Sequence, residues 1–328
     1  MTSLLDRLYA RISNRRLFFR DGWGDLSPLR AVQARGFDPG PTGKIEIEWD
    51  REEHADGLIL KQGQFPSPYD GPGLPEESRT AYVEWVMPKR ASGGTPVCLH
   101  FAATGDEGFA RRRAAFAEPL ARAGIGSLIL ENPFYGKRRP AGQHSKMLRR
   151  FSDLWTMGVA TIQEGRSLSQ WLYERGYATQ ASCGISMGGH MAAKVGVLSD
   201  VPMAIACFVT PHSAAAVFTE GLLKDYCAWH TLGRELNGAG NAFELMRELL
   251  HLTDIRLLSL PEKPQGIFML GAKKDAYVPP GSVRLLHEHW PGSTLRWIDS
   301  GHVGAFLFHR RPFLNAIMEA IHALKSCG

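Results

Sequence analysis

A serine with a glycine two residues away on each side constrains the fold of this chain more than any other feature. The stretch runs from Gly184 to Gly188 and reads GISMG. Residues 178–184 are predicted to form a short buried strand. Residues 187–197 are small and apolar with Lys194 as their only charge, which is typical of a buried helix. Because glycine has no Cβ, the strand and the helix can approach closely. The stretch therefore predicts a sharp strand-to-helix turn with Ser186 at its apex.

Short apolar runs alternate with helical patterns along most of the chain. Strands are predicted at 44–49, 57–62, 79–87, 96–101, 125–130, 203–209, 267–271 and 294–298. Helices are predicted at 111–123, 153–173 and 283–290, with a final helix that carries Phe313, Ile317, Ile321 and Leu324 at helical spacing. This alternation implies an α/β fold, a mostly parallel sheet with helices on both faces and an antiparallel start.

The length suits a single domain. A chain of 328 residues can bury one large α/β core, and the sequence contains no internal repeat or interdomain linker. The alternation breaks into helical pieces between Pro211 and Pro264. We therefore expect one domain over 1–328, with a small helical lid inserted at about 211–264 and an N-terminal amphipathic segment over about 1–24.

The cysteines favour a reducing compartment. There are five, and they lack the spacing of a metal or redox motif: Cys98, Cys183, Cys207, Cys227 and Cys327. We expect reduced core thiols, no metal, no disulfide and no cofactor. The net charge of +5 comes without a nucleic-acid-reading motif, so no nucleic-acid partner is expected. No apolar run is long enough for a membrane span, which predicts a cytoplasmic protein.

Residues 3–19 have the pattern of a basic amphipathic helix. Apolar residues fall on one face and arginines elsewhere: Leu4, Leu5, Leu8 and Ile12 against Arg7, Arg11, Arg15 and Arg16. Ser3 and Asp6 resemble a capping pair. We favour a helix packed on the domain with its arginines solvated. Peripheral membrane contact, or a transit peptide in a eukaryote, remains the alternative. The sequence carries no signal for an oligomeric state.

A histidine and an acid follow the serine in the order that an activated serine requires. The hydroxyl is protonated at neutral pH, so its attack on a carbonyl needs a histidine base oriented by a carboxylate. In doubly wound hydrolases the order is Ser, acid, His, each at the carboxyl end of a strand. Asp275 follows the predicted strand 267–271, and His302 follows 294–298. The candidate triad is therefore Ser186, Asp275 and His302.

Other residues compete for these roles less well. The competitors are His190, His212, Asp225, Asp254 and Asp299. His190 lies on the helix after the serine and points along it, whereas His212 follows a strand end and is the stronger rival base. Asp299 is too close in sequence to His302. The remaining two acids fall in the predicted lid.

Two backbone N–H groups would stabilise an oxyanion. One is that of Met187, directly after the serine, and the other comes from the loop after strand 96–101. Ala102 or Ala103 is the predicted second donor, since the small residues of this loop let the backbone line a carbonyl oxygen. The alternative is a tight glycine loop without a catalytic role.

The motifs together resemble the α/β-hydrolase domain-containing protein 18 family. The resemblance rests on Thr104-Gly105-Asp106, Arg111-Arg112-Arg113, LENPFYG at 130–136, 184–191, Lys274 to Pro279, Gly301-His302 and the opening 17–24. It implies an α/β-hydrolase fold and the same three triad residues. Eukaryotic members carry a long polar insertion before the acid strand, whereas this chain has a compact segment there. A substrate preference of the family that depends on its lid is therefore not expected to apply to this chain.

Two further family-like stretches have charged residues. Six basic residues follow a predicted strand end, on the catalytic side of the sheet: Lys137, Arg138, Arg139, Lys146, Arg149 and Arg150. They would either attract an anionic head group or form a solvated loop. Asp106 with the arginines 111–113 is expected to form an internal ion pair that holds the oxyanion loop.

We therefore expect a metal-independent serine hydrolase that cleaves a carboxylic ester, an acyl or lipid ester, through an acyl-enzyme. Two alternatives stay open. A noncatalytic relative could serve as a binding or scaffold protein, because a fold does not guarantee an activity. A thioesterase or peptidase could use the same triad, because the triad specifies acyl transfer and not the leaving group.

Overall fold

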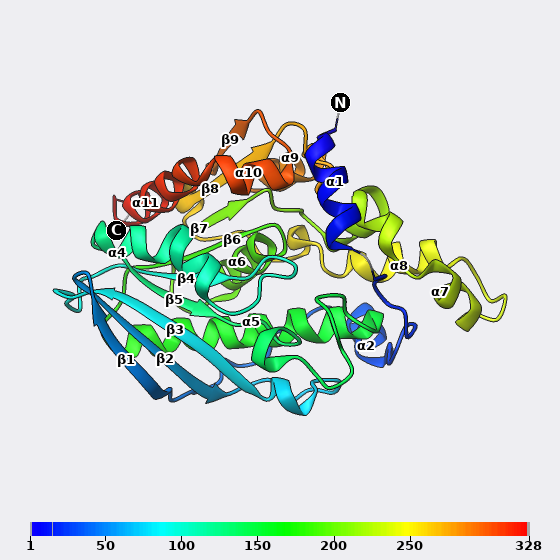
Figure 1. The fold of residues 1–328 in the computed structure, drawn as a ribbon, viewed down its shortest axis with the longest axis horizontal. Helices are drawn as coiled ribbons and strands as arrows, with labels where there is room; N and C mark the ends of the chain where they lie inside the picture. Colours follow the sequence, from blue (N-terminus) through cyan, green and yellow to red (C-terminus); the bar gives the residue numbers. More distant parts are fainter. Residues whose placement is uncertain (1, 15, 327–328) are drawn as a thin grey trace.

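The computed structural model describes residues 2–14 and 16–326. Within them, nine strands form one sheet in the order β1-β2-β3-β5-β4-β6-β7-β8-β9 (Figure 1). The antiparallel part is β1 (Glu48–Ala55), β2 (Leu58–Pro66) and β3 (Thr80–Pro88). The parallel part is β4 (Val97–Phe101), β5 (Gly126–Leu130), β6 (Gln180–Ile185), β7 (Met203–Phe208), β8 (Ile267–Ala272) and β9 (Thr294–Ile298). The predicted mostly parallel sheet with an antiparallel start is confirmed.

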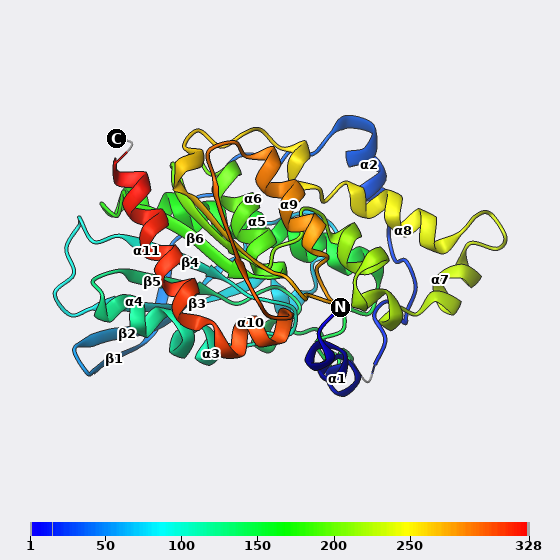
Figure 2. The same cartoon turned by 90° about the horizontal axis from the view of Figure 1, so that it is seen from above.

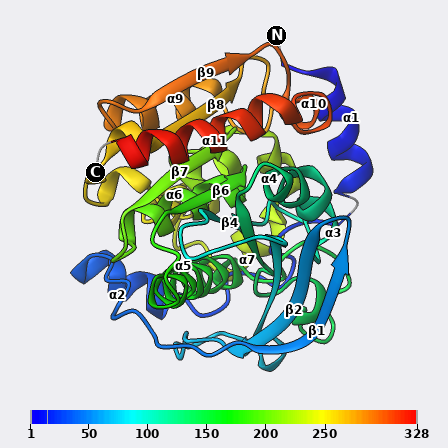
Figure 3. The same ribbon diagram turned by 90° about the vertical axis from the view of Figure 1, so that its left-hand side faces the viewer.

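Helices cover both faces of the sheet, as predicted (Figure 3). One face packs against α5 (Phe151–Glu174), α6 (Met187–Leu198) and α9 (Pro280–His289). The other packs against α11 (Arg310–Ser326) and a broken helix of α3 (Ala110–Arg112), a π-helical turn (Arg113–Ala117) and α4 (Glu118–Arg122). Strand residues alternate between the two cores, so Ile205 faces α6 and α9, whereas Phe208 stacks on Phe313 of α11.

The segment between β7 and β8 is helical. It contains α7 (Trp229–Glu235), α8 (Ala242–His251) and short turns at Ala216–Glu220, Leu222–Tyr226 and Ile255–Leu257. In Figure 1 its α7 end projects away from the sheet. It lies where a lid is predicted, and its first turns supply apolar side chains above the sheet.

The N-terminal region differs from its prediction. The helix expected over 3–19 ends at Ser13, so α1 is Leu4–Ser13. Phe18 instead forms a bridge with Cys227, and its N–H donates to Tyr226 O at 2.8 Å. Phe18 therefore pairs with another segment of the chain instead of continuing the helix. Arg15 and Cys327 lie outside the described residues.

Three other elements depart from expectation. The strand predicted at 44–49 begins only at Glu48, since β1 is a charged edge strand without the apolar run that marks buried strands. Helices α2 (Ser27–Arg35) and α10 (His302–Phe308) were not predicted. Among the described helices, none combines the length and the apolar character needed to cross a bilayer.

Candidate active site

Ser186 occupies the apex of a tight strand-to-helix turn. Its φ of 57° and ψ of −120° lie in a region that non-glycine residues rarely adopt. A Cβ on Gly184 would lie 2.2 Å from the carbonyl carbon of Gly188, and one on Gly188 would lie 2.3 Å from Phe101 O. Glycine is therefore required at both positions. The turn holds the serine hydroxyl away from β6, at the carboxyl end of the sheet.

Asp275 lies in the loop after β8 and is almost fully buried. Its Oδ1 accepts hydrogen bonds from the N–H groups of Tyr277 and Val278, both at 2.8 Å. Its Oδ2 lies 2.7 Å from Nδ1 of His302. The loop amides thus orient the carboxylate toward the imidazole.

His302 is the first residue of α10 and lines the same cavity as Ser186. Burial lowers the pKa of His302, but the charge and hydrogen bond of Asp275, with a smaller effect of Asp6, outweigh it and raise the pKa above its ordinary value. With its Nδ1 proton donated to Asp275, the Nε2 lone pair is free to accept a proton. Among the described residues no hydrogen bond yet joins Ser186 to His302, and such contacts often tighten only with substrate.

A second carboxylate, that of Asp6 on α1, holds together the loops that carry Asp275 and His302. It is fully buried. Its Oδ2 accepts from the N–H groups of Ala276 (3.0 Å) and His302 (2.9 Å), and its Oδ1 accepts from Val303 N at 3.0 Å. One side chain therefore fixes the residue after Asp275 and the first turn of α10.

Sequence reasoning assigned Asp6 only to a cap with Ser3. That cap exists, since the N–H of Asp6 donates to Ser3 Oγ at 3.3 Å. The signal available was that Asp6 is the single acidic residue of Leu4–Ser13. Its partners lie some 270 or more positions away, so the sequence does not reveal them.

The cavity above Ser186 has a volume of about 400 Å³ and a mostly apolar lining. Aromatic and aliphatic side chains come from α5 and from the segment after β7: Leu154, Trp155, Ile162, Val217, Phe218 and Leu223. Met187 and Ala103 also line it, whereas Ala102 is fully buried. Of the two predicted donors in that loop, Ala103 is therefore the one that lines the cavity, and a first-turn N–H such as that of Met187 has no acceptor within α6.

The rival residues have other partners. His190 Nδ1 lies 3.0 Å from Pro211 O, and burial, followed by the charge of Lys194, lowers the pKa of His190 to about 3. His212 Nδ1 contacts Ser282 Oγ at 2.7 Å, away from Asp275. Asp299 is exposed and pairs with Lys274. Asp225 is exposed, and Asp254 pairs with Arg256 at 2.7 Å.

The basic residues of 137–150 do not form one patch. Arg138 is fully buried against Glu164, Arg139 pairs with Glu107 and Arg149 with Asp21. Of the six predicted residues, only Lys146 lines the cavity. The other expected pair is confirmed, because Arg112 Nε lies 3.0 Å from the buried Asp106, and its guanidinium also donates to His100 O.

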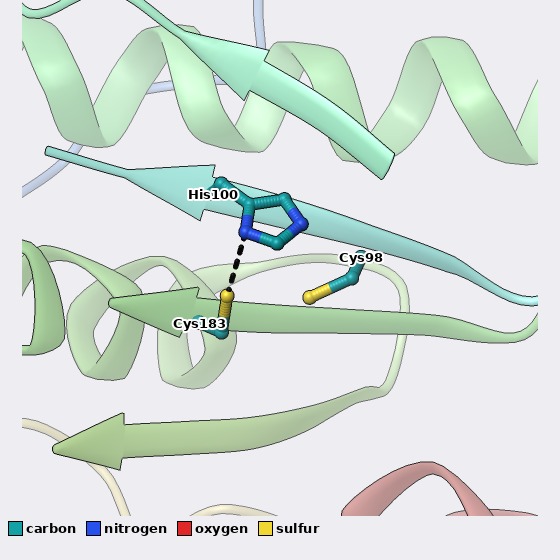
Figure 4. Close-up of side chains that lie close together, drawn as sticks. All are labelled: Cys98, His100 and Cys183. Carbon is teal, nitrogen blue, oxygen red and sulfur yellow. Dashed lines mark hydrogen bonds between the residues drawn. The ribbon is translucent and has the colours of Figure 1, made fainter. Parts of the chain in front are cut away.

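Two thiols and an imidazole lie beneath the turn (Figure 4). Cys98, His100 and Cys183 place their ligand atoms within 4.8 Å of one another, all buried. His100 lies 3.0 Å from the Cys183 sulfur through Nδ1 and 2.9 Å from Ser127 through Nε2. Burial opposes ionisation of Cys183, but the hydrogen bond from Cys98, then the charge of His100 and its hydrogen bond, lower the pKa of the Cys183 thiol. These residues offer three ligands, whereas a structural zinc site has four protein ligands.

Solved structures share the fold. An acetyl xylan esterase from Paenibacillus sp. R4 is 15% identical with a TM-score of 0.60, and the match covers 93% of this chain and 98% of that chain. Acetyl xylan esterase 1 from Thermoanaerobacterium sp. JW/SL YS485 is 14% identical with a TM-score of 0.54, over 98% and 99%. A cold-adapted esterase from an Arctic intertidal metagenomic library is 16% identical with a TM-score of 0.53, over 85% and 98%.

The sequence also matches one family model over most of its length. The model is described as "Alpha/beta hydrolase domain containing 18", and it matches residues 16–244 and 237–323. These ranges include the strand-to-helix turn, Asp275 and His302. On the extent of this match, joined to the observed sheet order and turn, the chain belongs to the α/β-hydrolase domain containing 18 family.

Proposed function

We propose that this protein is a serine hydrolase that cleaves a carboxylic ester with Ser186 as nucleophile, His302 as base and Asp275 as orienting acid. The observation that carries the proposal is the 2.7 Å contact between Asp275 and His302, with the imidazole in the same cavity as the strained Ser186. Such an acid–base pair is what a neutral hydroxyl needs to attack a carbonyl.

In the proposed mechanism, His302 Nε2 takes the proton of Ser186 as Oγ attacks the ester carbonyl carbon. The tetrahedral anion is stabilised by the N–H groups of Met187 and Ala103. The imidazolium then gives its proton to the leaving alkoxide, which releases the alcohol and leaves an acyl-enzyme. Water, deprotonated by the same imidazole, attacks the acyl-enzyme. The imidazolium returns this proton to Ser186 Oγ as the ester bond to the serine breaks, which releases the acid and restores the enzyme.

The cavity favours an acyl or lipid ester as substrate. Its apolar lining suits a hydrocarbon chain. Lys146, Arg111 and Asp106 also line it, and Arg111 lies 3.7 Å from Asp106. Burial, then the charge of Arg111, lowers the pKa of Lys146. The two cations in the lining favour a substrate that carries an anionic group.

The test is hydrolysis of matched acyl esters, thioesters and anilides of increasing chain length. We expect the esters to be cleaved, with a preference for longer chains, and Ser186→Ala to lose about 10³-fold or more of the rate. Ser326→Ala, an exposed serine far along α11, is the matched control and should keep full activity.

Two outcomes would redirect the proposal. Preferred cleavage of thioesters or anilides would point to a thioesterase or a peptidase with the same residues. A folded protein that cleaves none of the three classes would favour a noncatalytic binding protein.

A further inference from the structure

We propose that α1 and α10 form a docking surface for an anionic lipid bilayer, beside the mouth of the cavity. Most large apolar side chains that the described residues expose lie here. The apolar face, as we call it, consists of Leu4, Leu5, Leu8, Ile12, Leu307 and Phe308. Leu4, Ile12 and Phe308 are 71%, 67% and 74% exposed.

The two helices form one continuous surface. They lie side by side in all three views of the fold (Figure 2). A Cβ added to Gly304 of α10 would lie 3.8 Å from Leu5 Cδ2, and Ser3 packs against Gly301. The apolar face is therefore a single patch drawn from both ends of the chain.

Helix α1 exposes its apolar side chains to solvent, which is the reverse of an ordinary surface helix. Its buried residues are Asp6 and Ala10, whereas its leucines and isoleucine point outward. Asp6 anchors α1 to the domain, since its carboxylate accepts three backbone hydrogen bonds. Each exposed Leu or Ile forgoes the favourable free energy of burying its apolar surface. An apolar phase that covers these side chains would recover it.

The charge around the apolar face selects an anionic partner. Five exposed arginines belong to α1 or closely follow α1 or α10 in the sequence: Arg7, Arg11, Arg16, Arg310 and Arg311. None of them forms a salt bridge within the described residues. The described part of 4–17 and residues 302–318 contain no acid other than the buried Asp6. Apolar residues bordered by arginines suit insertion at the head-group level of an anionic membrane.

The same charge argues against a second copy of this chain. A two-fold interface brings the same patch of both copies together. The bordering arginines would then face one another without acidic partners. An anionic bilayer would cover the apolar face with lipid and supply negative charge to the arginines around it.

The apolar face leads directly to the cavity. Tyr9, Phe306 and Leu307 belong to these two helices and line the cavity together with Ser186. A molecule that leaves a bilayer here would pass from lipid to apolar protein without crossing water. Docking itself requires no catalysis, so this proposal can succeed or fail apart from the proposed function.

The experiment is vesicle co-sedimentation of the full chain in a Ser186→Ala background, which keeps the lipid intact. Vesicles contain phosphatidylcholine alone or equal parts phosphatidylcholine and phosphatidylglycerol. We expect binding to the anionic vesicles, weakened by salt. Leu8→Ser with Ile12→Ser should weaken it about tenfold or more, and Arg7→Gln with Arg11→Gln by a similar factor. None of these four residues lines the cavity.

The matched control is Leu257→Ser with Leu260→Ser, since these leucines are 58% and 60% exposed outside the apolar face. That variant should bind like the parent, and circular dichroism should show every variant folded. Absence of binding to anionic vesicles, or equal binding by the apolar-face variant, would overturn the proposal. So would a lipid-free dimer that the apolar-face substitutions dissociate, because a second copy would then cover the surface.

Discussion

At the scale of single residues, the positions of Asp275 and His302 depend on backbone amides that donate to buried carboxylates. Asp275 receives two such amides and Asp6 receives three. A charged acceptor with several amide donors is a strong restraint, since each charge-assisted bond contributes about 1.5–3 kcal/mol. Asp6 does not touch the cavity and acts by positioning His302.

Replacement of Asp6 tests this role. Asp6→Asn should lower kcat about ten- to a hundredfold, because the amide cannot accept all three hydrogen bonds. Asp6 also raises the pKa of His302, so removing its charge lowers that pKa. The base then stays neutral to lower pH, and the acid limb of the kcat/KM profile should move to lower pH. Asp225→Asn, an exposed aspartate, is the control. An unchanged profile would contradict the positioning role.

Residue-level prediction from sequence is possible where a local rule exists. The triad candidates follow from chain order and strand ends, and the structure brings Asp275 to His302. Asp6 was missed because its role arises only when α1 packs on loops far along the chain. The dispersal of the basic residues was also unpredictable, since the burial of Arg138 depends on Glu164 of α5.

At the scale of elements, the strand-to-helix turn depends on the close approach of β6 and α6 at Gly184 and Gly188. Buried strands were predicted within a few residues, since apolar runs mark them directly. The charged edge strand β1 was misplaced, and the seven-residue α10 is too short for its periodicity to register. The helix predicted at 111–123 is interrupted by a π-helical turn at Arg113–Ala117, which the apolar spacing does not encode.

A methyl group added to the turn should be costly. Gly184→Ala places a Cβ 2.2 Å from the Gly188 backbone, so either β6 or α6 must move. We expect a loss of about 1–3 kcal/mol or more in unfolding free energy, measured by urea denaturation. Gly281→Ala, in α9 with nothing within 4 Å of the added carbon, is the control and should be nearly neutral. Equal stability of the two variants would contradict the close approach.

At the scale of the whole molecule, a buried ion pair joins the two halves of the sheet to the long helix. Arg138, after β5, lies 2.8 Å from Glu164 of α5 and donates to the carbonyls of Glu131 and Ser78. Both side chains are fully buried. The pair therefore links the antiparallel start, β5 and α5 in the core.

Breaking this pair should destabilise the whole domain. Glu164→Gln leaves a buried guanidinium without its counter-charge, and we expect a loss of about 3–5 kcal/mol in unfolding free energy. The control is Glu319→Gln, which breaks the exposed pair with Arg296 and should cost about 1 kcal/mol or less. Similar losses in urea unfolding for both variants would contradict the structural role of the buried pair.

The central claim, that Ser186 is activated by His302, is tested most directly by a fluorophosphonate probe with mass-spectrometric mapping. We predict rapid, stoichiometric labelling of Ser186 and of no other serine. His302→Ala should slow labelling about 10³-fold or more, and Ser186→Ala should abolish it. A folded parent protein that labels no faster than Ser186→Ala, or that labels elsewhere, would contradict the account.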